Sequence, residues 1–224
     1  MSKILVVDEG ARQAAAQAYA ASQNENWLAL ETATRMQDGP DKAAAMFGIL
    51  ANANFPLTGV RDIHVKLGNE DFELNRNEYM VLQCARLVKL RGNDTVVSDW
   101  QRLLSAVSAH SQKICERVAL MALNYADKMS DFQIVVGSEK KQVEKTKDGK
   151  TIKETQSEPI MGSAKAEIVN ITIIYGRNFL MNNDVCNRAL PMLETLHPVK
   201  FKFWSAARDS ARKAADEVQK QKVA

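Results

Sequence analysis

The sequence predicts a mainly α-helical (α+β) protein with a helical core, a small hairpin in its N-terminal half and a projecting β-hairpin arm at about residues 137–162. Three observations lead to this prediction. Apolar residues recur at helical spacing in several segments that are separated by short polar breaks. Apolar and polar residues alternate between 63 and 74, as in a hairpin. A charged stretch at 137–162 has an Asp-Gly pair at its centre, which is a strong local signal of a tight hairpin turn.

The N-terminal half begins with helical segments. An alanine-rich stretch at 9–23 predicts a first helix. A second helix is expected at 42–51 behind Pro40, because proline suits the first position of a helix. The alternating segments 63–67 and 72–74 then predict the two strands of a small hairpin.

Two capping boxes mark the central helices. Asn75 and Glu78 predict the start of a helix over 76–90 that is apolar on nearly every side and therefore central. Ser98 and Gln101 predict a second start, with the next helix beginning at Ser98. Both boxes combine a side chain that caps the first turn with a residue that bonds back to the cap.

The C-terminal half contains a predicted strand between helices. Apolar residues at helical spacing favour a helix over 114–125. Alternating β-branched residues predict a strand at 167–175. A helix capped by Asn183 or Asp184 is expected before Leu196, and a basic, alanine-rich helix at 204–222.

The charged stretch at 137–162 is predicted to be an arm that contacts another molecule. A two-residue turn at its Asp-Gly pair would place four pairs of residues opposite one another: Lys147 and Lys150, Thr146 and Thr151, Lys145 and Ile152, Glu144 and Lys153. Neither face of this hairpin is apolar enough to be buried, and a two-stranded hairpin alone is marginally stable. The arm carries both lysine and glutamate residues, and this mixed charge does not favour binding to the phosphates of a nucleic acid. We therefore expect subunit contacts at Lys145, Lys147, Asp148, Gly149 and Ile152.

Composition is typical of a globular protein, and the sequence contains no recognisable catalytic or metal-binding motif. Of the 224 residues, 46% are hydrophobic and 25% charged, so we expect one domain over 1–224 with the arm and the basic C-terminal helix as parts of it. No apolar run is long enough to cross a membrane, which predicts a cytoplasmic protein without a membrane partner. The three cysteines are scattered and the three histidines lack ligand spacing, so no catalytic residue, metal or cofactor is predicted, and we do not expect an enzyme.

Basic residues form the second group of candidate site residues. The net charge is +3, and the segment from Pro198 onward holds seven basic and three acidic residues. Cations at a helix end can simply complement the helix dipole, but they can also line a groove for a nucleic-acid backbone. The candidate phosphate contacts are Arg86, Lys89, Arg91, Arg102, Lys113, Arg117, Arg177, Arg208 and Arg212. Four aromatic residues could stack on bases, although a core position is favoured: Tyr175, Phe201, Phe203 and Trp204.

Two functions from different classes follow from these expectations. The first is a self-assembling structural protein, such as the coat or nucleocapsid subunit of a helical or icosahedral virion. It would oligomerise through the arm and package nucleic acid, with single-stranded RNA expected, by phosphate contacts that do not depend on base sequence. The alternative is a nucleic-acid-binding accessory protein, for example from a phage, that acts as a monomer or dimer. A small enzyme without a recognisable motif is the third choice.

Overall fold

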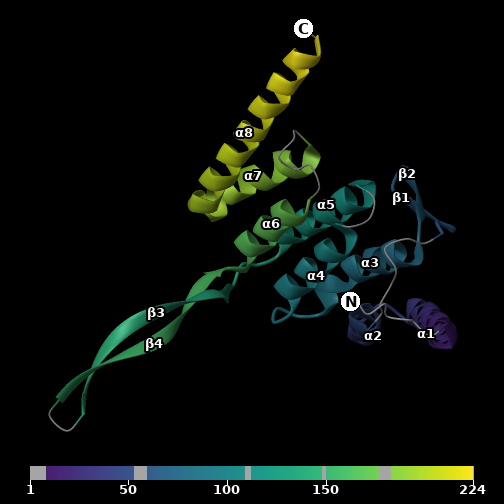
Figure 1. Cartoon of the computed structure of the whole chain (residues 1–224), viewed down its shortest axis with the longest axis horizontal. Helices are drawn as coiled ribbons and strands as arrows, with labels where there is room; N and C mark the ends of the chain where they lie inside the picture. Colours follow the sequence, from purple (N-terminus) through teal and green to yellow (C-terminus); the bar gives the residue numbers. More distant parts are fainter. Residues whose placement is uncertain (1–8, 53–59, 109–111, 148–149, 177–182, 224) are drawn as a thin grey trace, which may run out of the picture. The chain divides into compact units, whose positions relative to one another are not determined.

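The computed structural model describes residues 9–52, 60–108, 112–147, 150–176 and 183–223. Within these residues the chain forms eight α-helices, one 3-10 turn and two antiparallel hairpins (Figure 1), which confirms the mainly α (α+β) prediction. Contacts group the chain into two compact units, Met1–Val96 and Val97–Ala224. The single-domain expectation stays a prediction. Among the described residues, no helix is long and apolar enough to cross a membrane.

The first unit packs three helices with a small hairpin. Its elements are α1 (Glu9–Arg35), α2 (Pro40–Asn52), β1 (Ile63–Leu67), β2 (Glu70–Leu74), α3 (Arg76–Leu87) and a 3-10 turn (Val88–Leu90). Strands β1 and β2 pair antiparallel around Gly68, whose positive φ of 68° suits glycine at the turn. The core is built from side chains of α1, α2, β2 and α3 that are almost fully buried: Leu30, Met46, Phe47, Leu74 and Met80. The predicted hairpin is confirmed.

The capping box predicted for α3 is confirmed atom by atom. The Asn75 side chain accepts a hydrogen bond from the Glu78 backbone N–H at 2.9 Å, and a Glu78 carboxylate oxygen accepts one from the Asn75 N–H at 3.1 Å. Glu78 is fully buried, and its second oxygen accepts a hydrogen bond from Arg61 at 2.9 Å. The buried carboxylate therefore accepts two hydrogen bonds, one from the oppositely charged Arg61 and one from the Asn75 N–H, as burial of a carboxylate requires.

The second unit consists of helices from which a long β-hairpin extends. Its elements are α4 (Val96–Ser108), α5 (Gln112–Lys128), β3 (Gln133–Lys147), β4 (Lys150–Ser163), α6 (Ala164–Tyr175), α7 (Asp184–Leu196) and α8 (Pro198–Val223), with Val96 itself counted in the first unit. Helix α6 packs against α5 and α7, and α8 packs along α7. Trp100 of α4 lies against Tyr125 of α5 with ring centroids 5.7 Å apart. Asn183 caps α7, as expected, through the Cys186 N–H.

The strand predicted at 167–175 is wrong, because this segment belongs to helix α6. Ile168, Val169 and Ile171 are all buried, and α6 is buried over most of its surface, although Ile174 near its end is 48% exposed. A helix buried all round has apolar residues at consecutive positions, and its pattern then resembles that of a buried strand. The hydroxyl of Thr172 is also buried and donates to the Ile168 carbonyl at 2.7 Å, which satisfies it within the helix.

The helix start predicted at Ser98 is also wrong. Helix α4 begins at Val96, and Ser98 lies within its first turn. Val96 and Trp100 are both buried, and four-residue spacing places them on the same side of a helix. Burial of Val96 therefore extends the helix toward the N-terminus beyond the predicted cap.

Candidate assembly arm and basic surfaces

The predicted arm is a two-stranded antiparallel ribbon formed by β3 and β4. Its register pairs Lys147 with Lys150, Thr146 with Thr151, Lys145 with Ile152 and Glu144 with Lys153, as the Asp-Gly turn predicted. The turn residues Asp148 and Gly149 lie outside the described residues. The ribbon is longer than expected, since pairing continues to Gln133 and Ser163. Figure 1 shows it leaving the ends of α5 and α6 as a twisted ribbon with no helix of the second unit along its length.

Hydrogen bonds fasten the root of the ribbon to the start of α6. The Ala164 N–H donates to the Phe132 carbonyl at 2.9 Å, and Asp131 accepts from the N–H groups of Phe132 and Lys165 at 3.0 Å each. Ser163 caps α6 through the N–H of residue 166. Burial works to raise the pKa of Asp131, but the Lys165 N–H, the Ser163 hydroxyl and the Phe132 N–H together hold that pKa below its ordinary value. These hydrogen bonds fasten both strands of the ribbon to the body of the second unit.

Exposed apolar side chains surround the base of the ribbon, and we call these four the apolar collar: Val135, Val136, Ile160 and Met161. Their exposed fractions are 63%, 44%, 43% and 52%. Val135 faces Met161 directly across the two strands, and the register shifts at Val136, which is typical of a β-bulge. A cluster of large exposed apolar side chains is typical of a protein contact surface.

A glycine makes room for the bulge in the collar. A Cβ atom on Gly162 would lie 2.8 Å from one methyl carbon of Val136 and 3.1 Å from the other. Val136 therefore occupies the space that a side chain at position 162 would need. This packing keeps the two strands close where the ladder is irregular.

The described middle of the ribbon is polar on its surface. Lys141 lies between Glu139 at 3.0 Å and Glu158 at 2.6 Å. The hydrogen bond to Glu158 has the largest effect on the pKa of Lys141 and the hydrogen bond to Glu139 the next largest, and both raise it. All three side chains are about half exposed, and exposed ion pairs contribute little stability. These ion pairs therefore contribute little to the stability of the ribbon, and their main effect is on the charge of its surface.

Three predicted phosphate contacts lie in the first unit at the end of α3 and the following 3-10 turn. Arg86 and Lys89 are exposed. A hydrogen bond from Lys42 at 2.7 Å lowers the pKa of Asp38, and the charges of Lys42, Arg86 and Lys89 lower it further. The two predicted cations therefore lie near Asp38, whose carboxylate partly offsets their charge.

Arg91, the third of these residues, packs on an aromatic ring. Its guanidinium carbon lies 4.9 Å from the centre of the Phe47 ring of α2, and the residue is half-buried. The structure thus gathers Arg86, Lys89 and Arg91 at a helix C-terminus, where the helix dipole also favours cations. Contact with phosphate stays a prediction.

The remaining predicted cations lie in the second unit, apart from Arg177, which lies outside the described residues. Arg102 on α4 and Lys113 on α5 are exposed. Arg117 on α5 is half-buried, and its buried Nε has no hydrogen-bond partner among the described residues. The predicted groove would bring these three residues together with Arg86, Lys89 and Arg91 of the first unit. That groove stays a prediction.

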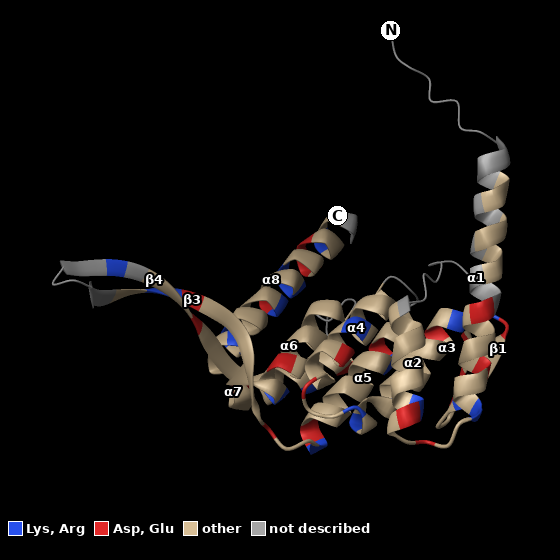
Figure 2. Ribbon diagram, turned by 90° about the horizontal axis from the view of Figure 1, so that it is seen from below, with Lys and Arg blue, Asp and Glu red and all other residues tan. Residues whose placement is uncertain are grey.

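Arg208 and Arg212 lie one turn apart on α8 near Cys186 of α7. Burial raises the pKa of the Cys186 thiol, and the charges of both arginines oppose that shift. Arg208 also bonds to the Asp209 carboxylate at 3.1 Å. Figure 2 shows acidic residues between the basic ones along α8, so this helix carries mixed charge.

The aromatic residues near α8 differ in burial. Trp204 donates its indole N–H to Asn170 at 3.0 Å, and Tyr175 and Phe201 are half-buried. Phe203 is 63% exposed and lies edge-on to Trp204 with ring centroids 4.9 Å apart. The expected core position is therefore wrong for Phe203, because most of its side chain is exposed to solvent.

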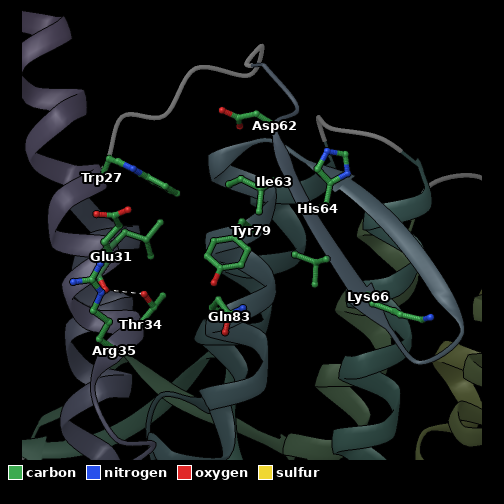
Figure 3. Close-up of a pocket in the computed structure, with 12 residues that line it drawn as sticks. Trp27, Glu31, Thr34, Arg35, Asp62, Ile63, His64, Lys66, Tyr79 and Gln83 are labelled. Atoms are coloured by element: carbon green, nitrogen blue, oxygen red, sulfur yellow. Dashed lines mark hydrogen bonds between the residues drawn. The ribbon is translucent and has the colours of Figure 1, made fainter.

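An open pocket of about 650 Å³ lies in the first unit between α1, β1 and α3. Figure 3 shows Trp27 of α1 and Tyr79 of α3 on two sides of it. Arg76 lies over the Trp27 ring at 4.4 Å. The charged lining is balanced, with two acidic and two basic residues: Glu31, Asp62, Arg35 and Lys66. This balance favours neither an anionic nor a cationic ligand.

The described residues contain no group of three or more His, Cys, Asp or Glu side chains that could hold a metal ion. Cys84, Cys115 and Cys186 are buried and none is joined in a disulfide, as expected for structural thiols. Comparison with protein-family models, with curated proteins and with solved structures finds no match for this chain.

The apolar collar is the part of the candidate site that sequence reasoning missed. The arm predicted from the sequence begins at residue 137 and therefore leaves out Val135 and Val136. Extending the register from the Asp-Gly turn would have placed Ile160 and Met161 beside Val135 and Val136, on a ribbon already expected to project. The signal was therefore present in the spacing of the two apolar runs.

Proposed function

We propose that the chain is a self-assembling structural protein, a coat or nucleocapsid-type subunit that joins like copies through the β3–β4 arm and packages nucleic acid. The observation that carries this proposal is the arm itself. Within the described residues it is a long ribbon with an apolar collar, its two strands pair with each other and with no third strand, and the helix it contacts most is α6 at its root. Such a surface becomes stable through contact with another molecule.

The hydrogen-bonded root supports a role in assembly. The Phe132 carbonyl accepts from the Ala164 N–H and the Asp131 carboxylate accepts from the Lys165 N–H, and these bonds hold the ribbon to the start of α6. A ribbon that is fixed at its base presents its edges and collar in one direction, which lowers the entropic cost of association. Strand edges add affinity through main-chain hydrogen bonds that demand little of the side chains.

The nucleic-acid part of the proposal depends on the cations at the end of α3 and on α8. Arg86 and Lys89 are exposed and adjacent, and Arg208 and Arg212 lie one turn apart. Arginine and lysine at such positions can contact phosphates without reading bases. Single-stranded RNA is the nucleic acid that we propose.

A shortened arm tests the assembly proposal. Replacement of residues 138–159 by Asn-Gly joins Gly137 to Ile160, which already face each other, and keeps the root and collar. The matched control changes only the tip, with Asp148→Asn in the full-length arm. We expect the shortened chain to fold with an unchanged melting temperature and to lose higher assembly in mass photometry and negative-stain microscopy, while the control assembles normally.

Two outcomes would overturn the assembly proposal. Normal assembly of the shortened chain would exclude the arm as the subunit contact. A full-length chain that stays a monomer at micromolar concentration with and without RNA would exclude a coat protein. For the nucleic-acid part, the logarithm of affinity for single-stranded RNA should fall with the logarithm of salt concentration by about 0.7 per phosphate contact, so a flat response would exclude such contacts.

A further inference from the structure

The two edges of the arm are not equivalent. In the described residues β3 and β4 pair only with each other, so each has an outer edge of unpaired backbone groups. Pro159 lies on β4 opposite Ser138. Proline has no N–H, and within a sheet its nitrogen faces away from the neighbouring strand. The outer edge of β4 therefore lacks a donor at Pro159, whereas β3 has no proline.

Alternation along β3 identifies the residues of its outer edge. If Pro159 faces outward, its partner Ser138 does too, because directly opposite residues of an antiparallel pair both point either toward or away from each other. Every second residue then presents its N–H and C=O outward: Ser138, Lys140, Gln142, Glu144 and Thr146. This edge lies beyond the bulge at Val136, so its pairing can be regular.

The charges along β3 are complementary to the same strand in the opposite direction. Antiparallel pairing of two β3 edges about a two-fold axis at Gln142 places Lys140 opposite Glu144 and Glu139 opposite Lys145. By symmetry each pair occurs twice. An axis at any other residue between 139 and 146 places like charges opposite each other, for example Lys141 against Lys145 when the axis is at Val143. Like charges in this position are destabilising.

We propose that the arms of two copies join edge to edge, β3 antiparallel to β3, with a two-fold axis at Gln142. The inference rests on the proposed function, because it specifies the partner of the same arm. Both copies use the same surface, so the contact closes into a symmetric dimer and does not by itself generate a chain of subunits. Growth of a larger particle then requires a second contact, for which the apolar collar is available.

Cross-linking tests the axis directly. Two residues on a two-fold axis of hydrogen-bonded antiparallel strands have Cα atoms about 5.5 Å apart, which is within the range of a disulfide. Gln142→Cys should therefore cross-link two copies under mild oxidation. The matched control is Gln156→Cys on β4, which faces Lys141 within the same hairpin. The native cysteines are buried and should not contribute.

Charge exchange tests the register. Lys140→Glu puts a glutamate opposite the partner's Glu144 at two places, and we expect it to raise the dimer dissociation constant about tenfold. Within its own hairpin Lys140 faces Ser157, so the ribbon itself should not be disturbed. Glu144→Lys should weaken the dimer similarly, and an equimolar mixture of the two variants should restore it, because opposite charges then meet at all four positions.

The outcomes separate this inference from the proposed function. Cross-linking of Gln142→Cys above the Gln156→Cys control, with rescue in the mixture, supports edge pairing. If the shortened arm abolishes assembly but Gln142→Cys does not cross-link above its control, or the mixture is not restored, the edge pairing is wrong and the assembly function stands. If the shortened chain assembles normally, both proposals fail.

Discussion

Replacing the most exposed facing pair of the apolar collar should weaken self-association without weakening the fold. Val135 and Met161 lie directly opposite each other on the ribbon. We consider the double substitution Val135→Thr and Met161→Gln, which nearly conserves shape and introduces polar groups. In the isolated chain both side chains are already largely in water, so the polar groups stay solvated.

The magnitude follows from the exposed fractions. Val135 is 63% exposed and Met161 is 52% exposed, so an interface can bury roughly half of each side chain. Complete burial of such a side chain is worth about 2 kcal/mol, and the two halves therefore contribute roughly 2 kcal/mol per collar. This corresponds to about a 30-fold increase in the dissociation constant of the contact. Because each assembled subunit contributes a collar, the effect on a particle should be larger.

The assay is sedimentation velocity over a concentration series, with the melting temperature measured in parallel. The control is Val60→Thr, a substitution at a valine that is 79% exposed and lies outside the arm. We expect the collar variant to dissociate at higher concentration than the control, at equal melting temperature. Unchanged association would refute the collar as a contact surface, and a lower melting temperature would show that these side chains support the fold itself.

Two further predictions concern the ribbon's base and root. Gly162→Ala should lower protection of the ribbon in amide hydrogen exchange, because the new Cβ would lie 2.8 Å from a Val136 methyl carbon. Adding Val136→Ala should restore protection, since the nearest remaining atom is then 3.5 Å away. A double variant without restored protection would contradict this packing. Asp131 has a lowered pKa in the folded protein, so its stabilisation is present above its unfolded pKa of 3.8 and is lost as the pH falls through the lower folded value. Thermal unfolding from about pH 5 to about pH 3 should therefore show a smaller acid loss in Asp131→Asn than in the control Asp127→Asn, and equal losses would contradict it.

Local signals predicted the arm well, because its structure depends on neighbours in sequence. The Asp-Gly pair set the register of facing residues such as Lys145 and Ile152 with no contribution from the rest of the fold. The capping box at Asn75 and Glu78 is equally local, since its atoms lie within one helical turn. The cations at Arg86 and Lys89 could be named from sequence for the same reason, although their shared surface with Asp38 could not.

Long-range packing decided what local patterns left ambiguous. The segment 164–175 is a helix packed between α5 and α7, and its extensive burial removes the difference between the helical and the strand pattern in the sequence. Helix α4 begins at Val96 because that side chain is buried with Trp100.

By itself the sequence determined that a polar hairpin projects and how its residues pair, because turn chemistry and strand alternation act over a few residues. Only the tertiary structure decided which apolar residues stay in water. Val135, Val136, Ile160 and Met161 are as apolar as core residues, and their exposure follows from the root of the ribbon, which carries them away from the helices. Burial depends on what surrounds a side chain in space, and the pattern along the chain does not contain that information.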